Sequence, residues 1–274
     1  MDTDMEIQGS GPVVVTGGAR GIGAATVERV ARTETDVVIA DTLVEEGTAT
    51  ADRVASTTGQ TVSFVETDVA DDASVAQLAT IIADEFDCVA GLVNNAGIRV
   101  EPLPVTQADE ASWDHILAVN LRGPARCAKR LIPLMTDGGC VVNVASNGAD
   151  VARPAWSQYD ATKGALISMT RDMACDHAVD DVRVNALSPG YVVTEYHMPE
   201  EDPEGFRADR MTPNPDGPGI VKRAAHPDEI AGPITFLLST EASFMTGTNV
   251  KVDGGVTAVG KGLSWAEYHG ELED

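Results

Sequence analysis

Tyr159 and Lys163 stand four positions apart in a stretch with helical periodicity, and this spacing suits proton transfer. In a helix it places both side chains on one face. A free phenol has a pKa of about 10, and a neighbouring ammonium stabilises the phenolate and lowers that pKa. The pair therefore predicts general acid–base chemistry on an alcohol or carbonyl oxygen. Ser146, thirteen residues before Tyr159, can donate a hydrogen bond to the same oxygen.

A glycine-rich segment near the N-terminus, TGGARGIG, lies between a predicted strand and a predicted helix. Gly17 lets the chain turn sharply, Gly21 lets the backbone approach a pyrophosphate, and Gly23 lets the helix pack against the sheet. The start of a helix also offers unpaired N–H groups and a partial positive charge to phosphate. The segment, which includes Arg20 and Ile22, therefore predicts a dinucleotide site.

Asp41 directly follows the second predicted strand, where an acidic residue can bind the ribose hydroxyls of adenosine. Its charge would repel a 2′-phosphate, so we expect NAD rather than NADP as the cofactor. Arg20 favours NADP instead, because a cation in the glycine loop can pair with the 2′-phosphate. Asp41 as a turn residue that caps the next helix is compatible with both cofactors. Lys163 can also hold the nicotinamide ribose.

Short apolar runs alternate with longer amphipathic stretches and position these residues. The predicted strands span residues 12–16, 36–40, 61–66, 91–94, 140–145, 182–187 and 249–252. The predicted helices span residues 22–32, 44–56, 73–85, 110–135, 156–176 and 228–238. Alternation of this kind predicts one α/β domain, a doubly wound Rossmann fold with a seven-stranded parallel sheet and helices on both faces.

The domain core is expected to span residues 12–255, with two additions. Residues 191–222 are rich in Pro, Gly, Asp and Glu and follow the carboxyl end of a strand, the edge where such folds bind ligands. We interpret them as a substrate lid with a short helix around residues 204–211, and a solvated insertion is the alternative. Residues 256–274 form a C-terminal tail.

Several motifs occur in the order and at the strand ends that the short-chain dehydrogenase/reductase family shows. The chain resembles this family from about Val13 to Gly255. The resemblance rests on TGxxxGxG, on NNAG beginning at Asn94, and on YxxxK beginning at Tyr159. It extends to these further matches: Asp68-Val69, Asn120, Ser146, Pro189-Gly190 with Thr194, and Val252-Asp253-Gly254-Gly255.

The resemblance implies roles for the matching residues. It implies a catalytic set in which Asn120 completes a water-linked relay, and its members are Asn120, Ser146, Tyr159 and Lys163. It also implies further contacts with the cofactor. Asp68 and Val69 would flank the adenine, and Asn94 and Ala96 would line the cofactor groove after the fourth strand. Val192 and Thr194 would hold the nicotinamide carboxamide. It also implies a homotetramer, with a dimer as second choice. Asp160 departs from the family, where small residues are usual after the tyrosine.

The substrate pocket is expected to contain polar residues after Gly97, residues between Ser146 and Tyr159, and the lid. The candidates are Arg99, Asn147, Arg153, Trp156, Tyr191, Tyr196 and His197. This polar set, with two arginines, suggests a secondary alcohol that carries further hydroxyls or a carboxylate, such as a sugar or a sugar acid. A guanidinium would bind the carboxylate of a sugar acid. Arginines lying on the surface beside the pocket are the alternative reading.

Two other functions fit parts of this sequence. An NADP-dependent 3-ketoacyl-thioester reductase shares the same motifs. A non-catalytic dinucleotide sensor shares the fold, but we would expect it to have lost Ser146, Tyr159 or Lys163, and this sequence keeps all three.

Composition narrows the partners. The formal net charge is −24, from 43 acidic and 19 basic residues, which argues against nucleic acid and anionic membranes. Such charge is best tolerated in concentrated salt, so we expect a halophilic source. The four cysteines form no CxxC motif and the five histidines show no metal-binding spacing, so no metal is expected. With no apparent signal or membrane segment, a cytoplasmic enzyme acting on a small alcohol or carbonyl compound is expected.

Overall fold

The computed structural model describes residues 5–195, 201–214, 217 and 219–259. Within these ranges, parallel strands form a seven-stranded sheet in the order β3-β2-β1-β4-β5-β6-β7. The strands are β1 (Val13–Thr16), β2 (Val37–Asp41), β3 (Val62–Glu66), β4 (Gly91–Asn94), β5 (Gly139–Val144), β6 (Val182–Pro189) and β7 (Asn249–Val252). The sheet confirms the predicted doubly wound architecture.

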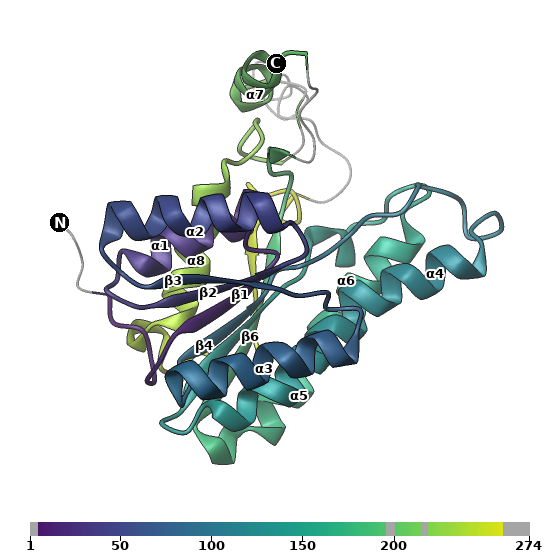
Figure 1. Ribbon diagram of the computed structural model, residues 1–274. Helices are drawn as coiled ribbons and strands as arrows, with labels where there is room; N and C mark the ends of the chain where they lie inside the picture. The colour runs from purple at the N-terminus through teal and green to yellow at the C-terminus, as the bar shows by residue number, and fades with distance from the viewer. Residues whose placement is uncertain (1–4, 196–200, 215–216, 218, 260–274) are drawn as a thin grey trace, which may run out of the picture.

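Helices cover both faces of this sheet (Figure 1). One face packs against α1 (Gly21–Ala31), α2 (Val44–Thr58) and α8 (Pro227–Leu238). The other packs against α3 (Asp72–Phe86), α5 (Gly123–Leu131) and α6 (Ser157–Asp176), while α4 (Glu110–Leu117) lies along α6. Short 3₁₀ turns complete the fold, at η2 (Ile132–Leu134), η3 (Asn147–Ala149), η4 (Ala178–Asp180) and η6 (Thr240–Ala242).

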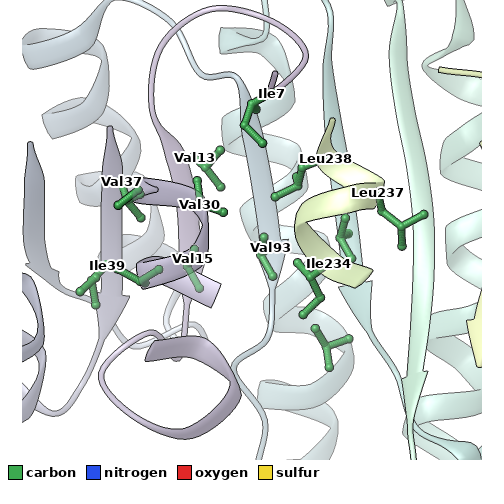
Figure 2. Packing of buried hydrophobic residues seen from close by; sticks show 14 of the residues in the cluster. Ile7, Val13, Val15, Val30, Val37, Ile39, Val93, Ile234, Leu237 and Leu238 are labelled. Atoms are coloured by element: carbon green, nitrogen blue, oxygen red, sulfur yellow. The ribbon is translucent and has the colours of Figure 1, made fainter. Parts of the chain in front are cut away.

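The core explains why the strands read as continuous apolar runs. Val13 and Val15 of β1 face α1 and α8, whereas Val14 faces the opposite helix layer, and all three are fully buried. Figure 2 shows Ile234 and Leu237 of α8 meeting the strand side chains on the first of these faces. A central parallel strand is buried on both faces, so the side chains that point to either face are mostly apolar.

The predicted helix at residues 110–135 is wrong as a single helix. After α4 the chain forms a π-helical segment, η1 (Ala118–Arg122), and then α5 and η2. Pro124 has no N–H to donate to the Asn120 carbonyl four residues earlier, as an α-helix would require. The register therefore changes at that point, and Pro133 ends α5 in the same way.

The described part of residues 191–222 includes the helix α7 (Pro203–Met211), close to the short helix predicted there. Asp202 caps it by accepting a hydrogen bond from the Gly205 N–H at 2.9 Å. Figure 1 shows α7 standing away from the sheet and its helix layers. No helix in the described ranges has both the length and the apolar composition needed to cross a bilayer.

Candidate functional site

The candidate catalytic residues lie at the carboxyl edge of the sheet, because all strands run parallel and end on the same side. Ser146 follows β5 by two residues and caps η3, where its hydroxyl accepts a hydrogen bond from the Gly148 N–H at 3.1 Å. Tyr159 and Lys163 lie in the first two turns of α6. The structure therefore brings together three residues that the sequence places in two different elements.

Tyr159 lies among aromatic and cationic side chains. Its ring meets Trp156 edge to face, with centroids 5.9 Å apart and an interplanar angle of 84°. Burial raises the pKa of Tyr159, and this outweighs the lowering by the Arg99 charge, by a hydrogen bond with Ser146 and by the Arg153 charge. The spacing of Tyr159 and Lys163 predicts a lowered pKa, and that direction is wrong here because the desolvation of the phenolate outweighs the nearby positive charges.

Lys163 is buried, with 4% of the residue exposed. Nζ donates a hydrogen bond to the Val144 carbonyl at 2.7 Å and lies 5.8 Å from the centre of the Tyr159 ring. Burial, followed by repulsion from Arg99, lowers its pKa to about 8. The lysine therefore still carries its charge at neutral pH, although it loses its proton at a much lower pH than an ordinary lysine does.

Asn120 links the segment after β4 to the catalytic helix. It is fully buried within η1. Its amide accepts from the Ile98 N–H at 2.8 Å, donates to the Ile98 carbonyl at 2.9 Å and reaches the Thr162 hydroxyl at 3.3 Å. Thr162 precedes Lys163, so these contacts position the lysine. The water-linked relay through Asn120 stays a prediction.

The glycine loop fits a dinucleotide pyrophosphate. Gly17 and Gly21 have φ values of 65° and 59°, which favour glycine. A Cβ at Gly17 would lie 2.8 Å from the Ala96 Cα, and one at Gly23 would overlap the Gly17 carbonyl oxygen. No side chain caps the N-terminus of α1, and its first turn holds no acidic residue. Arg20 occupies the N-cap position there, so the N–H groups of this turn suit a bound anion.

Asn95 is a site residue to which the sequence analysis gave no role. Its Nδ2 donates to the carbonyls of Thr16 and Gly17 at 3.0 and 2.9 Å. The Thr16 hydroxyl in turn accepts from the backbone N–H groups of Asn95 and Ala96, both at 3.1 Å. These bonds tie the glycine loop to the end of β4. The NNAG motif was a visible signal, but the contact depends on the pairing of β1 with β4.

Asp41 ends β2 beside the glycine loop. Its carboxylate accepts hydrogen bonds from the N–H groups of Ala19 at 3.0 Å and Leu43 at 3.1 Å. The Ala19 carbonyl accepts from the Thr50 hydroxyl of α2 at 2.8 Å, which fixes the same turn. Each carboxylate oxygen keeps a second lone pair, so this arrangement leaves Asp41 able to accept from a ribose hydroxyl.

The remaining predicted cofactor residues lie at neighbouring strand ends. Asp68 is exposed, and its carboxylate accepts from the Ala70 N–H at 2.8 Å, while Val69 is buried against Gly123 of α5. The Asn94 side chain is buried and donates to the Asn143 amide oxygen at 2.8 Å, so it holds β4 to β5.

After β6 the chain returns over the glycine loop. Val192 is buried and pairs with Ala225 in an isolated bridge. The Thr194 methyl lies 3.2 Å from where a Cβ on Gly21 would stand. The segment predicted to meet the nicotinamide therefore lies beside the segment predicted to meet the pyrophosphate.

The structure describes most of the candidate substrate residues. Arg99 and Arg153 lie 5.5 and 4.4 Å from the Trp156 ring centre and 5.8 and 5.7 Å from that of Tyr159. Asn147 begins η3 beside Ser146, whereas Tyr191 is exposed after β6. Tyr196 and His197 lie outside the described residues.

Comparison with known proteins adds independent findings. A family profile described as enoyl-(acyl carrier protein) reductase matches residues 17–257. The chain is 39% identical over 248 residues to cis-4-hydroxycyclohexanecarboxylate dehydrogenase of Sinomonas cyclohexanicum, covering 90% of this chain and 96% of that protein. It is 34% identical over 251 residues to meso-2,3-butanediol dehydrogenase of Serratia marcescens, covering 90% and 94%.

A solved structure extends the likeness. L-sorbose reductase from Gluconobacter frateurii, in complex with NADPH and L-sorbose, matches with a TM-score of 0.85 and 28% identity, covering 95% of this chain and 100% of that one. This chain belongs to the short-chain dehydrogenase/reductase family. As a short-chain dehydrogenase/reductase it is an oxidoreductase that acts on CH–OH groups, in a family that uses NAD(P).

Proposed function

We propose that this short-chain dehydrogenase/reductase transfers a hydride between a secondary alcohol and NAD, using Tyr159 as the acid/base. The observation that carries the proposal is the convergence of Tyr159, Lys163 and Ser146 at the carboxyl edge, next to the glycine loop. A catalytic function is favoured over a non-catalytic dinucleotide sensor, because a sensor would not need a buried ammonium beneath a phenol.

The proposed mechanism assigns each step to a side chain. Ser146 donates a hydrogen bond to the substrate oxygen and holds it beside the Tyr159 hydroxyl. In oxidation the Tyr159 phenolate accepts the hydroxyl proton of the alcohol, and in reduction the phenol returns a proton to the carbonyl oxygen. Lys163 supplies a positive charge that stabilises the phenolate, and its ammonium would also hold the nicotinamide ribose of a bound cofactor. The nicotinamide, when bound, supplies the hydride acceptor or donor.

The charge on Asp41 decides the proposed preference for NAD. We expect Asp41→Ala to lower the ratio of kcat/KM for NAD to that for NADP by about tenfold or more, because repulsion of the 2′-phosphate and the ribose hydrogen bonds are both lost. Asp41→Asn is the matched variant, since it keeps an acceptor for the Ala19 N–H but carries no charge. Initial rates with both cofactors measure the ratio. Equal rates in the unmutated enzyme would contradict the NAD assignment.

The proposed substrate is a secondary alcohol that carries further hydroxyls or a carboxylate, such as a sugar or a sugar acid. Arg99 is the proposed partner of that carboxylate, because its guanidinium carbon lies 5.8 Å from the centre of the Tyr159 ring. Residues 191–222, including α7, are proposed to cover the substrate. The relatives support this class, since one is named for a hydroxy carboxylate and a structural neighbour holds a ketose.

A substrate screen tests the proposed function. NADH formation is followed with secondary alcohols, polyols and hydroxy carboxylates in about 2–4 M KCl, because a net charge of −24 and the inferred halophilic source call for strong screening. We expect turnover with at least one class, and faster turnover with hydroxy carboxylates than with matched neutral alcohols. Cofactor binding without turnover of any substrate would favour the sensor and overturn the proposal.

A further inference from the structure

Arg153 and Asp160 form an ion pair across the turn that leads into α6. The guanidinium binds the carboxylate through two nitrogens, with Nη2 on Oδ1 and with Nε 3.3 Å from Oδ2. Asp160 is the residue after Tyr159, and its side chain is 16% exposed. Two parallel bonds of this kind fix the relative orientation of the two groups, not only their distance.

The Arg153–Asp160 pair packs closely against Gly148, in the turn that follows Ser146. A Cβ at Gly148 would overlap both the Asp160 carboxylate and the Arg153 guanidinium, so only glycine leaves room for the pair there. The Gly148 N–H donates to the Ser146 hydroxyl oxygen at 3.1 Å. The ion pair therefore lies against the backbone that orients the Ser146 hydroxyl.

The Arg153 guanidinium also contacts the aromatic side chains beside Ser146. It lies 4.4 Å from the ring centre of Trp156, which in turn meets the Tyr159 ring edge to face. Ala155, between Arg153 and Trp156, has a φ of 65°. A residue with a Cβ adopts that conformation at a cost, which the contacts around it must offset.

We propose that the Arg153–Asp160 ion pair is a positioning device that holds Ser146 and Tyr159 in register, and that its two opposite charges cancel at the phenol. The inference rests on the proposed function only in that Tyr159 is taken as the acid/base. Arg153 lowers the pKa of Tyr159 and Asp160 raises it, which agrees with opposed charges on one side of the ring. The other charged groups that face the phenol in the described ranges are Arg99, from the segment after β4, and Lys163.

Two single substitutions separate positioning from a merely structural role. Asp160→Asn leaves Arg153 uncompensated, so the pKa of Tyr159 should fall, whereas Arg153→Gln leaves Asp160 uncompensated, so that pKa should rise. In the double variant it should return close to the original value. The phenolate absorbance of Tyr159, taken as the difference from Tyr159→Phe during a spectroscopic pH titration, measures each shift without any need for turnover.

Steady-state kinetics test whether the ion pair positions Ser146 and Tyr159. We expect kcat to fall about tenfold in Arg153→Gln and in the double variant, with KM for the cofactor unchanged, and to recover in part in Arg153→Lys. Arg53→Gln is the matched control, because Arg53 pairs with Glu28 at 2.7 Å between α2 and α1, and these helices cover the opposite face of the sheet from α6.

The outcomes distinguish this inference from the proposed function. Shifts of the Tyr159 pKa in the same direction in both single variants, or no shift in either, would overturn the inference even if the enzyme oxidises alcohols. Full activity in Tyr159→Phe would overturn the proposed function, while the titration would still decide whether the two charges oppose each other.

Discussion

Tyr159→Phe should lower kcat for alcohol oxidation by about 100- to 10,000-fold, the range that general acid–base catalysis contributes. The substitution removes only the hydroxyl, so the edge-to-face contact with Trp156 and the packing of α6 are kept. Because the proposed oxidation needs the phenolate, the rate of the unmutated enzyme should rise steadily with pH toward the Tyr159 pKa, which burial raises. The variant should lack that rise. Initial rates of NADH formation from about pH 6 to pH 10 measure both effects.

The binding of cofactor provides the control for this result. NADH fluorescence titration should give a similar dissociation constant for Tyr159→Phe and the unmutated enzyme, because the glycine loop and Asp41 are untouched. A loss of both binding and activity would point to a folding defect. Undiminished turnover by a folded Tyr159→Phe would remove the basis of the proposed mechanism.

The fold was predictable because its signals are local. The strands of a doubly wound sheet are short apolar runs, and β4 and β7 have the predicted bounds, Gly91–Asn94 and Asn249–Val252. The stretch at residues 110–135 misled because its apolar pattern continues through η1. A periodicity of 3.6 residues does not reveal a change of hydrogen-bond register, although Pro124 was the available signal.

The site was predictable only where its contacts are close in sequence. Tyr159 and Lys163 share a helix face by spacing alone, and the structure places them as that spacing requires. Asn95 was missed because its amide reaches the glycine loop across the pairing of β1 with β4. The pairing of Asp160 with Arg153 had no signal in the sequence, because it depends on the path of the chain just before α6.

The charges around Tyr159 reveal a conflict between stability and function. Lys163 is buried with one hydrogen bond to the Val144 carbonyl, and its pKa of about 8 means that burial disfavours its charged form. Repulsion from Arg99 disfavours the charged lysine further. A sequence selected for stability alone would not place an ammonium there, so we interpret the lysine as retained for its charge.

Lys163→Met should therefore separate activity from stability. We expect kcat/KM to fall about 100- to 1000-fold, because the charge proposed to stabilise the phenolate and the proposed contact with the nicotinamide ribose are both removed. The free energy of unfolding at pH 7 should change little or increase. Losing the donor to the Val144 carbonyl costs about 1–3 kcal/mol, but the burial of an ammonium is relieved. Lys129→Met, on the exposed face of α5, is the matched control and should change neither quantity.

The pH dependence of this stability difference checks the physical cause. In the unmutated enzyme Lys163 loses its proton near pH 8 when folded and near pH 10.5 when unfolded. Between these values the unfolded chain binds the extra proton, so the folded state gains stability as pH rises. Lys163→Met lacks this gain, and any stability advantage of the variant at pH 7 should shrink toward pH 10 in denaturant titrations. An advantage that stays constant with pH would show that packing, and not the buried charge, separates the two proteins.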